Sequence, residues 1–138
     1  MADIKGGCLC GAVRFSGSGD PLFMANCHCA DCRKSSASGH MSLLGLPKDK
    51  VQFTGEMSEY EIKADSGATV AHHFCPTCGS QIYNDTTNGA GNVAIVATTL
   101  DDPSVFSPQA VVYASGAAPW DPPYDGVPHF EKMPPAGG

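Results

Sequence analysis

The sequence predicts a mainly β protein of short antiparallel strands and many turns, with at most short helical turns. The chain contains 16 glycines and 11 prolines among 138 residues, and this composition favours turns over long helices. Candidate strands recur at roughly 8 to 12 residues, a spacing typical of all-β proteins. The length predicts a single domain over residues 1–138, in which residues 116–138 form a Pro-rich C-terminal tail packed on the rest.

The expected elements follow one another along the chain. Residues 4–16 predict a strand broken by glycines, in which Cys8 and Cys10 point to the same face. Residues 30–37 predict one or two helical turns. Further strands are expected at 41–46, 51–54, 57–62, 69–74, 81–84 and 93–99, with a polar loop over 84–92. Eight of the prolines lie beyond residue 100, so the tail is expected to be extended and packed, without regular elements.

All seven cysteines fall into three compact motifs. These are a CxC, a CxCxxC and a CxxC, made of Cys8 and Cys10, of Cys27, Cys29 and Cys32, and of Cys75 and Cys78. Three thiols within six residues have few uses other than holding a metal. Metal thiolates are common in reducing compartments, where disulfides are rare. A disulfide interpretation would require an oxidising compartment and would leave one of the seven thiols unpaired.

Seven sulfurs divide naturally into a closed metal site of four and an open site of three. Structural zinc takes four protein ligands, whereas catalytic zinc usually keeps three and leaves a position for water or substrate. We expect the closed, structural site to contain Cys8, Cys10, Cys75 and Cys78, and the open, exchangeable or catalytic site to contain Cys27, Cys29 and Cys32. Spacing alone leaves an alternative open, in which Cys27 and Cys29 complete a four-cysteine site with the CxxC.

An open zinc site made of thiolates favours sulfur chemistry. Three thiolates leave zinc a weaker Lewis acid than three histidines do, so activating water is not its strongest use. A substrate thiol in the free position would become a nucleophilic thiolate at neutral pH, which indicates attack on an electrophilic carbon such as an aldehyde. Arg33 and Lys34 follow the triad and are candidates to bind a substrate carboxylate, although a solvated helix end explains them equally well.

The flanks of the three motifs are also informative. The runs GGCxCGAV, CHCxxCRKSS and FCPTCGSxIY occur in this order between Gly6 and Tyr83. They resemble the glutathione-dependent formaldehyde-activating (GFA) family, which also includes centromere protein V. The resemblance implies an Mss4-like, mostly β fold with one structural zinc on the four cysteines and a second zinc on the CxCxxC. It also implies a carbon–sulfur lyase, similar to an S-(hydroxymethyl)glutathione synthase, that acts on glutathione and formaldehyde.

The charge, the hydropathy and one motif argue against several other classes of protein. A net charge of −6, with eight scattered Lys and Arg, does not supply the basic face that nucleic-acid binding needs. The chain lacks a long apolar run and a signal-peptide core, so we expect a soluble, cytoplasmic protein with no membrane partner. A zinc deaminase would need a PCxxC motif, but Pro76 follows Cys75 instead of preceding it.

The sequence also allows a second functional hypothesis and an oligomeric assembly, and it predicts the positions of several other residues. A non-catalytic zinc module that binds a protein or a small thiol is the second functional hypothesis, and a homodimer is among the assemblies that the sequence allows. In a strand, His28 would point away from the neighbouring sulfurs, so we expect it to pack rather than to act in catalysis. Trp120, Tyr124 and Phe130 are expected to cover the core.

Overall fold

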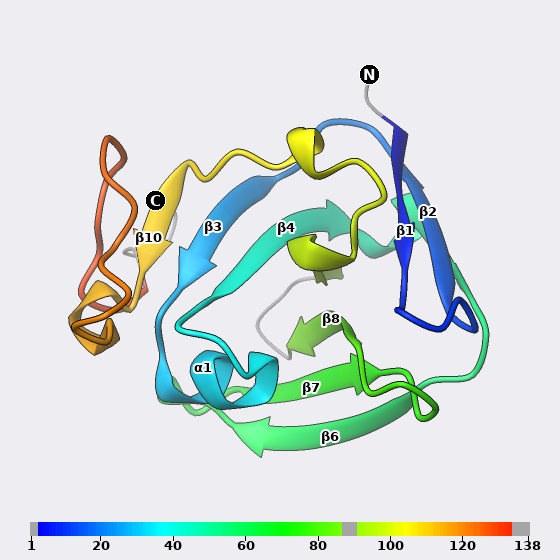
Figure 1. Ribbon diagram of the computed structural model, residues 1–138, viewed down its shortest axis with the longest axis horizontal. Helices are drawn as coiled ribbons and strands as arrows, with labels where there is room; N and C mark the ends of the chain where they lie inside the picture. Colours follow the sequence, from blue (N-terminus) through cyan, green and yellow to red (C-terminus); the bar gives the residue numbers. More distant parts are fainter. Residues whose placement is uncertain (1–2, 87–90, 134–138) are drawn as a thin grey trace.

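The computed structural model describes residues 3–86 and 91–133, which form two β-sheets, one short α-helix and several 3₁₀ turns (Figure 1). This architecture confirms the mainly β fold predicted from the sequence. The strands are β1 (Asp3–Gly7), β2 (Arg14–Ser18), β3 (Phe23–Cys27), β4 (Met41–Pro47), β5 (Val51–Thr54), β6 (Ser58–Lys63), β7 (Thr69–Phe74), β8 (Gln81–Thr86), β9 (Asn92–Val96) and β10 (Ala110–Val112). The helical segments are α1 (Ala30–Ser36), η1 (Lys48–Lys50), η2 (Ala97–Thr99), η3 (Pro103–Val105) and η4 (Ala114–Gly116).

The strands pair almost entirely antiparallel. The three-stranded sheet has the order β1-β2-β5, and the seven-stranded sheet has the order β10-β3-β4-β9-β8-β7-β6. The exception is β10, which runs parallel to β3 at the edge of the larger sheet. Figure 1 shows this sheet curving, with β3 and β4 in the upper part of the view, β6, β7 and β8 in the lower part, and α1 beside β7. The curvature brings the end of β3 and the helix toward the opposite half of the sheet.

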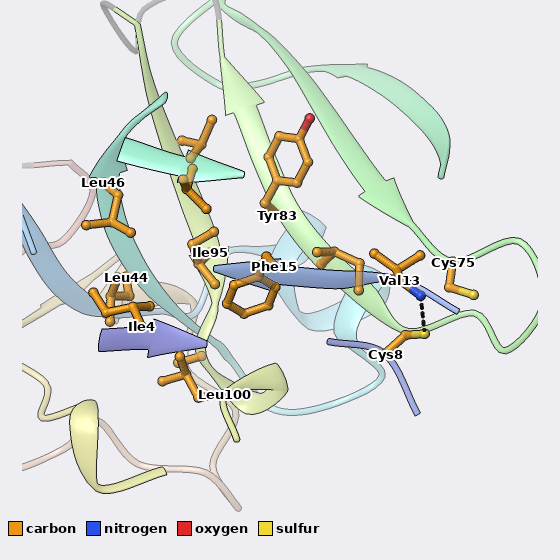
Figure 2. Packing of buried hydrophobic residues seen from close by; sticks show 14 residues of the cluster. Ile4, Cys8, Val13, Phe15, Leu44, Leu46, Cys75, Tyr83, Ile95 and Leu100 are labelled. Atoms are coloured by element: carbon orange, nitrogen blue, oxygen red, sulfur yellow. Dashed lines mark hydrogen bonds between the residues drawn. The ribbon is translucent and has the colours of Figure 1, made fainter. Parts of the chain in front are cut away.

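The main core lies between the two sheets. In β1 and β2 every second residue is buried, the alternation expected for strands with one face covered. The buried faces place Ile4 and Phe15 of the small sheet against Leu44, Ile82 and Ile95 of the large one (Figure 2). Two cysteines, Cys8 and Cys75, lie at the edge of the same cluster, so sulfur and apolar packing are continuous there.

The expected strand boundaries hold in the middle of the chain and shift at both ends. The strand expected over 4–16 is two strands, because β1 ends at Gly7 and a turn precedes β2. The strand expected over 93–99 ends at Val96, where the chain enters η2. Of the polar loop expected over 84–92, residues 84–86 belong to β8, residue 92 begins β9, and residues 87–90 lie outside the described residues.

The Pro-rich segment beyond residue 100 contains regular structure that the sequence did not reveal. Strand β10 forms there because its backbone groups find partners on both sides. It pairs with β3, and Val111 donates to the Pro128 carbonyl and accepts from the Phe130 amide. The expectation for the aromatic residues of the tail is only partly correct: Phe130 packs on a buried cluster, whereas Trp120 and Tyr124 are 74% and 51% exposed.

Truncating a buried side chain between the sheets should destabilise the protein strongly. Leu44 is fully buried, so Leu44→Ala is expected to lower the free energy of unfolding by about 2–5 kcal/mol. Urea unfolding of the metal-loaded protein would measure this loss. Leu22→Ala is the matched control, because Leu22 is 52% exposed and its truncation should have a small effect. Equal losses in the two variants would contradict this description of the core.

Candidate functional site

Four cysteine sulfurs meet where the two sheets adjoin. Cys8 and Cys10 come from the connection between β1 and β2, and Cys75 and Cys78 come from the connection between β7 and β8. Their sulfurs all lie within 4.8 Å of one another. The Sγ–Sγ distances are 3.6 Å for Cys8–Cys10 and 3.7 Å for Cys10–Cys75. Sulfurs bound tetrahedrally to zinc at about 2.3 Å would be separated by about 3.8 Å, so the four-sulfur group fits a zinc ion.

The first pair of sulfurs lies on a turn, not on one face of a strand as predicted. The Gly11 amide donates to the Cys8 carbonyl at 3.2 Å, and the Cys8 amide donates to the Val13 carbonyl at 3.0 Å. Gly11 has φ of +84°, a conformation that residues with a side chain rarely adopt. The glycine therefore permits a tight turn that places both sulfurs on the same side without strand geometry.

The second pair lies on a compact turn between β7 and β8. The Gly79 amide donates to the Cys75 carbonyl at 2.8 Å, and Gly79 has φ of +79°. A hydrogen bond with the Ser80 hydroxyl, 3.3 Å from the Cys78 sulfur, is the main cause that lowers the pKa of Cys78 to about 5. A hydrogen bond from the Val13 amide to the Cys8 sulfur (Figure 2) is likewise the main cause that lowers the pKa of Cys8. Both interactions favour the thiolate, the form that binds metal.

The remaining three sulfurs form a separate group at the start of α1. Cys27 is the last residue of β3, Cys29 is the N-cap of α1, and Cys32 lies in its first turn. The helix begins here because the extended backbone of Cys29 lets its sulfur accept a hydrogen bond from the Cys32 amide at 3.3 Å. The three sulfurs lie within 4.8 Å of one another. The structure thus groups Cys27 and Cys29 with Cys32, and not with the CxxC.

The electrostatics of this three-sulfur group favour a bound cation. Hydrogen bonds with the Cys27 and Cys32 thiols lower the pKa of Cys29 to about 2. Hydrogen bonds with the Cys27 and Cys29 sulfurs raise the pKa of Cys32, and the hydrogen bond with the Cys29 sulfur raises the pKa of Cys27 to about 12. One thiolate therefore forms readily, but three adjacent thiolates repel one another unless a positive ion lies between them. The donor set of the group fits a soft divalent metal such as zinc.

An apolar wall surrounds the three sulfurs. Cys27 and Cys32 are buried with Met41, Val96 and Val112 in a second cluster, and Cys29 is only partly buried. Two tail aromatics, Tyr113 and Phe130, pack against this second cluster. Access to the group is therefore from the side of Cys29.

Tyr113 is a site residue that the sequence did not reveal. Burial is the main cause that raises the pKa of Tyr113, and Asp65, Cys27 and Cys29 raise it further, so its hydroxyl stays protonated at neutral pH. Its backbone has φ of +53°, which is uncommon for a residue with a side chain and often marks a functional site. No motif surrounds it, so only its place in the fold links it to the cysteines.

The two basic residues of α1 have different surroundings. The Arg33 Nε donates to the His28 carbonyl at 3.3 Å, so this partly buried side chain holds the backbone between two of the sulfurs. Lys34 is exposed and lines a cleft of about 520 Å³ with Asp31, Tyr60 and other residues of β6 and β7. A cleft of about 690 Å³ lies near Cys8 and Arg14. Neither cleft is lined by Cys27, Cys29 or Cys32, so the size of a cleft does not identify the three-sulfur group as a site.

Comparison with known proteins identifies the family. A family model described as glutathione-dependent formaldehyde-activating enzyme (GFA) matches residues 3–116. The chain belongs to the GFA family. Membership confirms the resemblance inferred from the three cysteine motifs and associates this GFA protein with glutathione-dependent activation of formaldehyde.

A solved structure supports the fold of the GFA chain. The crystal structure of a Rhodobacter sphaeroides protein superposes with a TM-score of 0.58, at 20% sequence identity, covering 91% of this chain and 98% of that chain. At this identity the likeness extends to the fold alone. No curated protein sequence matches the chain. Among residues 3–86 and 91–133, no helix is long and apolar enough to cross a bilayer.

The two sulfur groups are expected to differ in their effect on stability. Cys75→Ser removes a ligand that joins the two sheets and should lower the Tm by roughly 10 °C or more. Cys32→Ser removes a ligand held within one local segment, and should cost one metal ion per chain with a much smaller change in Tm. Metal analysis and thermal unfolding followed by circular dichroism would measure both effects. If the two variants lost the same stability, the sulfur group between the sheets would have no special structural role.

Proposed function

We propose that this GFA protein is a zinc-dependent carbon–sulfur lyase, which forms or cleaves the adduct of a thiol such as glutathione with a small aldehyde such as formaldehyde. The observation that supports this proposal is the separate group of Cys27, Cys29 and Cys32. Three protein sulfurs leave zinc one ligand short of its usual four. A zinc ion bound there would supply a position at which a substrate thiol loses its proton and remains nucleophilic at neutral pH.

In the synthetic direction, the substrate sulfur forms a bond to the carbonyl carbon while the π electron pair moves to the oxygen, which takes a proton. The product is an S-hydroxymethyl thioether, and the reverse steps return the thiol and the aldehyde. The protonated hydroxyl of Tyr113, on the aromatic wall beside the sulfurs, is suited to donate a hydrogen bond to the oxygen as it gains charge. The apolar wall formed with Phe130 would keep water away from the reacting sulfur.

The basic residues of α1 would orient the catalytic segment and the substrate. Arg33 holds the carbonyl of His28, and so fixes the backbone that carries Cys27 and Cys29. Lys34 is exposed and lines the cleft beside α1, where its ammonium group can attract a carboxylate. Glutathione has two carboxylates. The two residues adjacent in sequence therefore have different proposed roles, with Arg33 a positioning residue and Lys34 a substrate contact.

The reaction itself tests the proposal. The metal-loaded protein should accelerate the exchange between glutathione, formaldehyde and their adduct, as measured by two-dimensional exchange NMR. Cys32→Ser should reduce the exchange rate to the uncatalysed background, because the three-sulfur group loses a ligand. Ser38→Ala, a change at an exposed residue just beyond α1, should leave the rate unchanged. Failure of the wild-type protein to accelerate exchange would count against a lyase, and full activity of Cys32→Ser would count against the three-sulfur group as its site.

The role of Lys34 gives a second, independent test. Lys34→Ala should raise the KM for glutathione by about 2–5-fold with kcat unchanged, because a solvent-exposed ion pair contributes up to about 1 kcal/mol. The same variant should not change the KM for 2-mercaptoethanol, which has no carboxylate. Lys50→Ala, at another exposed lysine, is the control. An equal rise in KM for glutathione and for 2-mercaptoethanol would exclude a contact between Lys34 and a substrate carboxylate.

One observation favours a second function, that of a non-catalytic zinc module that binds a protein. Trp120 and Tyr124, which were expected to cover the core, are 74% and 51% exposed in the tail. Exposed aromatic side chains are enriched at protein interfaces. If the exchange experiment shows no acceleration, this surface is the next feature to test, through the effect of Trp120→Ala on partner binding.

A further inference from the structure

A third cluster of metal-binding side chains lies next to the CxCxxC segment. His28 connects β3 to α1, His40 immediately precedes β4, and Asp121 ends a turn in the tail. The Nδ1 atom of His40 is 2.6 Å from the Asp121 Oδ2 atom, and the Nδ1 atom of His28 is 3.7 Å from the same oxygen. One ligand atom from each of the three residues lies within 4.8 Å of the others. Three segments that are distant in the sequence thus converge on one point.

The imidazole of His28 has no partner that explains its burial. His28 is fully buried, and neither of its ring nitrogens makes a hydrogen bond within the described part of the chain. The Gly39 backbone interacts with the ring, but outside hydrogen-bond geometry. Buried polar groups are nearly always paired, and an exception calls for an ion, a water molecule or a functional role. Its Nδ1 atom faces the Asp121 carboxylate at a distance too long for a hydrogen bond.

We propose that His28, His40 and Asp121 bind one divalent first-row transition-metal ion, at a site distinct from both sulfur groups. Two imidazoles and one carboxylate are a ligand set that suits Zn²⁺, Fe²⁺ and Co²⁺. Ligands bound tetrahedrally at about 2.05 Å lie about 3.3 Å apart. The 3.7 Å distance from His28 to Asp121 is about 0.4 Å longer than this value, and the 2.6 Å hydrogen bond between His40 and Asp121 would have to open by about 0.7 Å when the ion binds. The Asp121 side chain is one quarter exposed and ends a turn, so it has room to move.

Gly39 leaves space for the carboxylate of Asp121. A Cβ atom at this position would overlap the Asp121 side chain, whereas the glycine leaves the space free. The absence of a side chain is therefore a steric condition for the site. An ion bound here would also tie the tail to the backbone between Cys27 and Cys29.

The site can be tested by titrating the full, metal-free chain with Co²⁺ under anaerobic, reducing conditions. Sulfur-bound cobalt gives an intense near-ultraviolet charge-transfer band, whereas a site of nitrogen and oxygen ligands gives only weak visible bands. We expect one further equivalent of Co²⁺ to bind, by equilibrium dialysis and metal analysis, after the charge-transfer band has saturated. Asp121→Asn and His40→Gln should each weaken this last step by roughly tenfold or more and leave the charge-transfer band unchanged.

Matched controls separate this site from general binding to acidic or histidine side chains. Asp125→Asn and His129→Gln change exposed residues of the same tail and should bind the last equivalent as the wild type does. Gly39→Ala keeps all three ligands but displaces Asp121, so it should also weaken that step; the charge-transfer band reports whether the variant is folded. The proposal is overturned if cobalt binding ends when the charge-transfer band saturates, or if Asp121→Asn and His40→Gln bind the further equivalent as tightly as the wild type.

Discussion

The meeting of four sulfurs at the junction of the two sheets is the constraint on which the rest of the structure depends. The small sheet contributes Cys8 and Cys10, and the large sheet contributes Cys75 and Cys78. The ion pair between Arg14 of the small sheet and Asp101, which follows η2, is about half exposed on both sides and is weak by comparison. A cation among four thiolates would convert their repulsion into attraction, and would bind the two halves of the apolar core together.

The three-sulfur group follows a different physical logic. Its members come from one short stretch, in which the thiol of Cys29 caps the helix that carries Cys32. The group can therefore form without joining distant elements, and losing one ligand there should affect chemistry more than folding. Its neighbours are apolar, and the sulfurs shift the pKa of one another, so their closeness favours a bound cation.

The C-terminal segment completes the surroundings of this stretch. Strand β10 lies parallel to β3, and this pairing places Tyr113 and Phe130 against the cluster that contains the sulfurs. The same segment also places Asp121 beside His28 and His40. The Pro-rich C-terminal segment thus contributes an aromatic wall, a hydroxyl and a carboxylate to the surroundings of the CxCxxC segment.

Local features of the fold and of the cysteine groups could be predicted from the amino-acid sequence. Short strands such as β5 and β7 followed from their composition and flanking turns, and the CxCxxC had to bring its sulfurs together because six residues cannot reach far apart. The pairing of β10 with β3 and the contact of Asp121 with a histidine 81 positions earlier emerge only when the whole chain packs. The physical reason is that local propensity acts over a few residues, whereas these contacts depend on which buried surfaces and hydrogen-bonding edges meet when the whole chain packs.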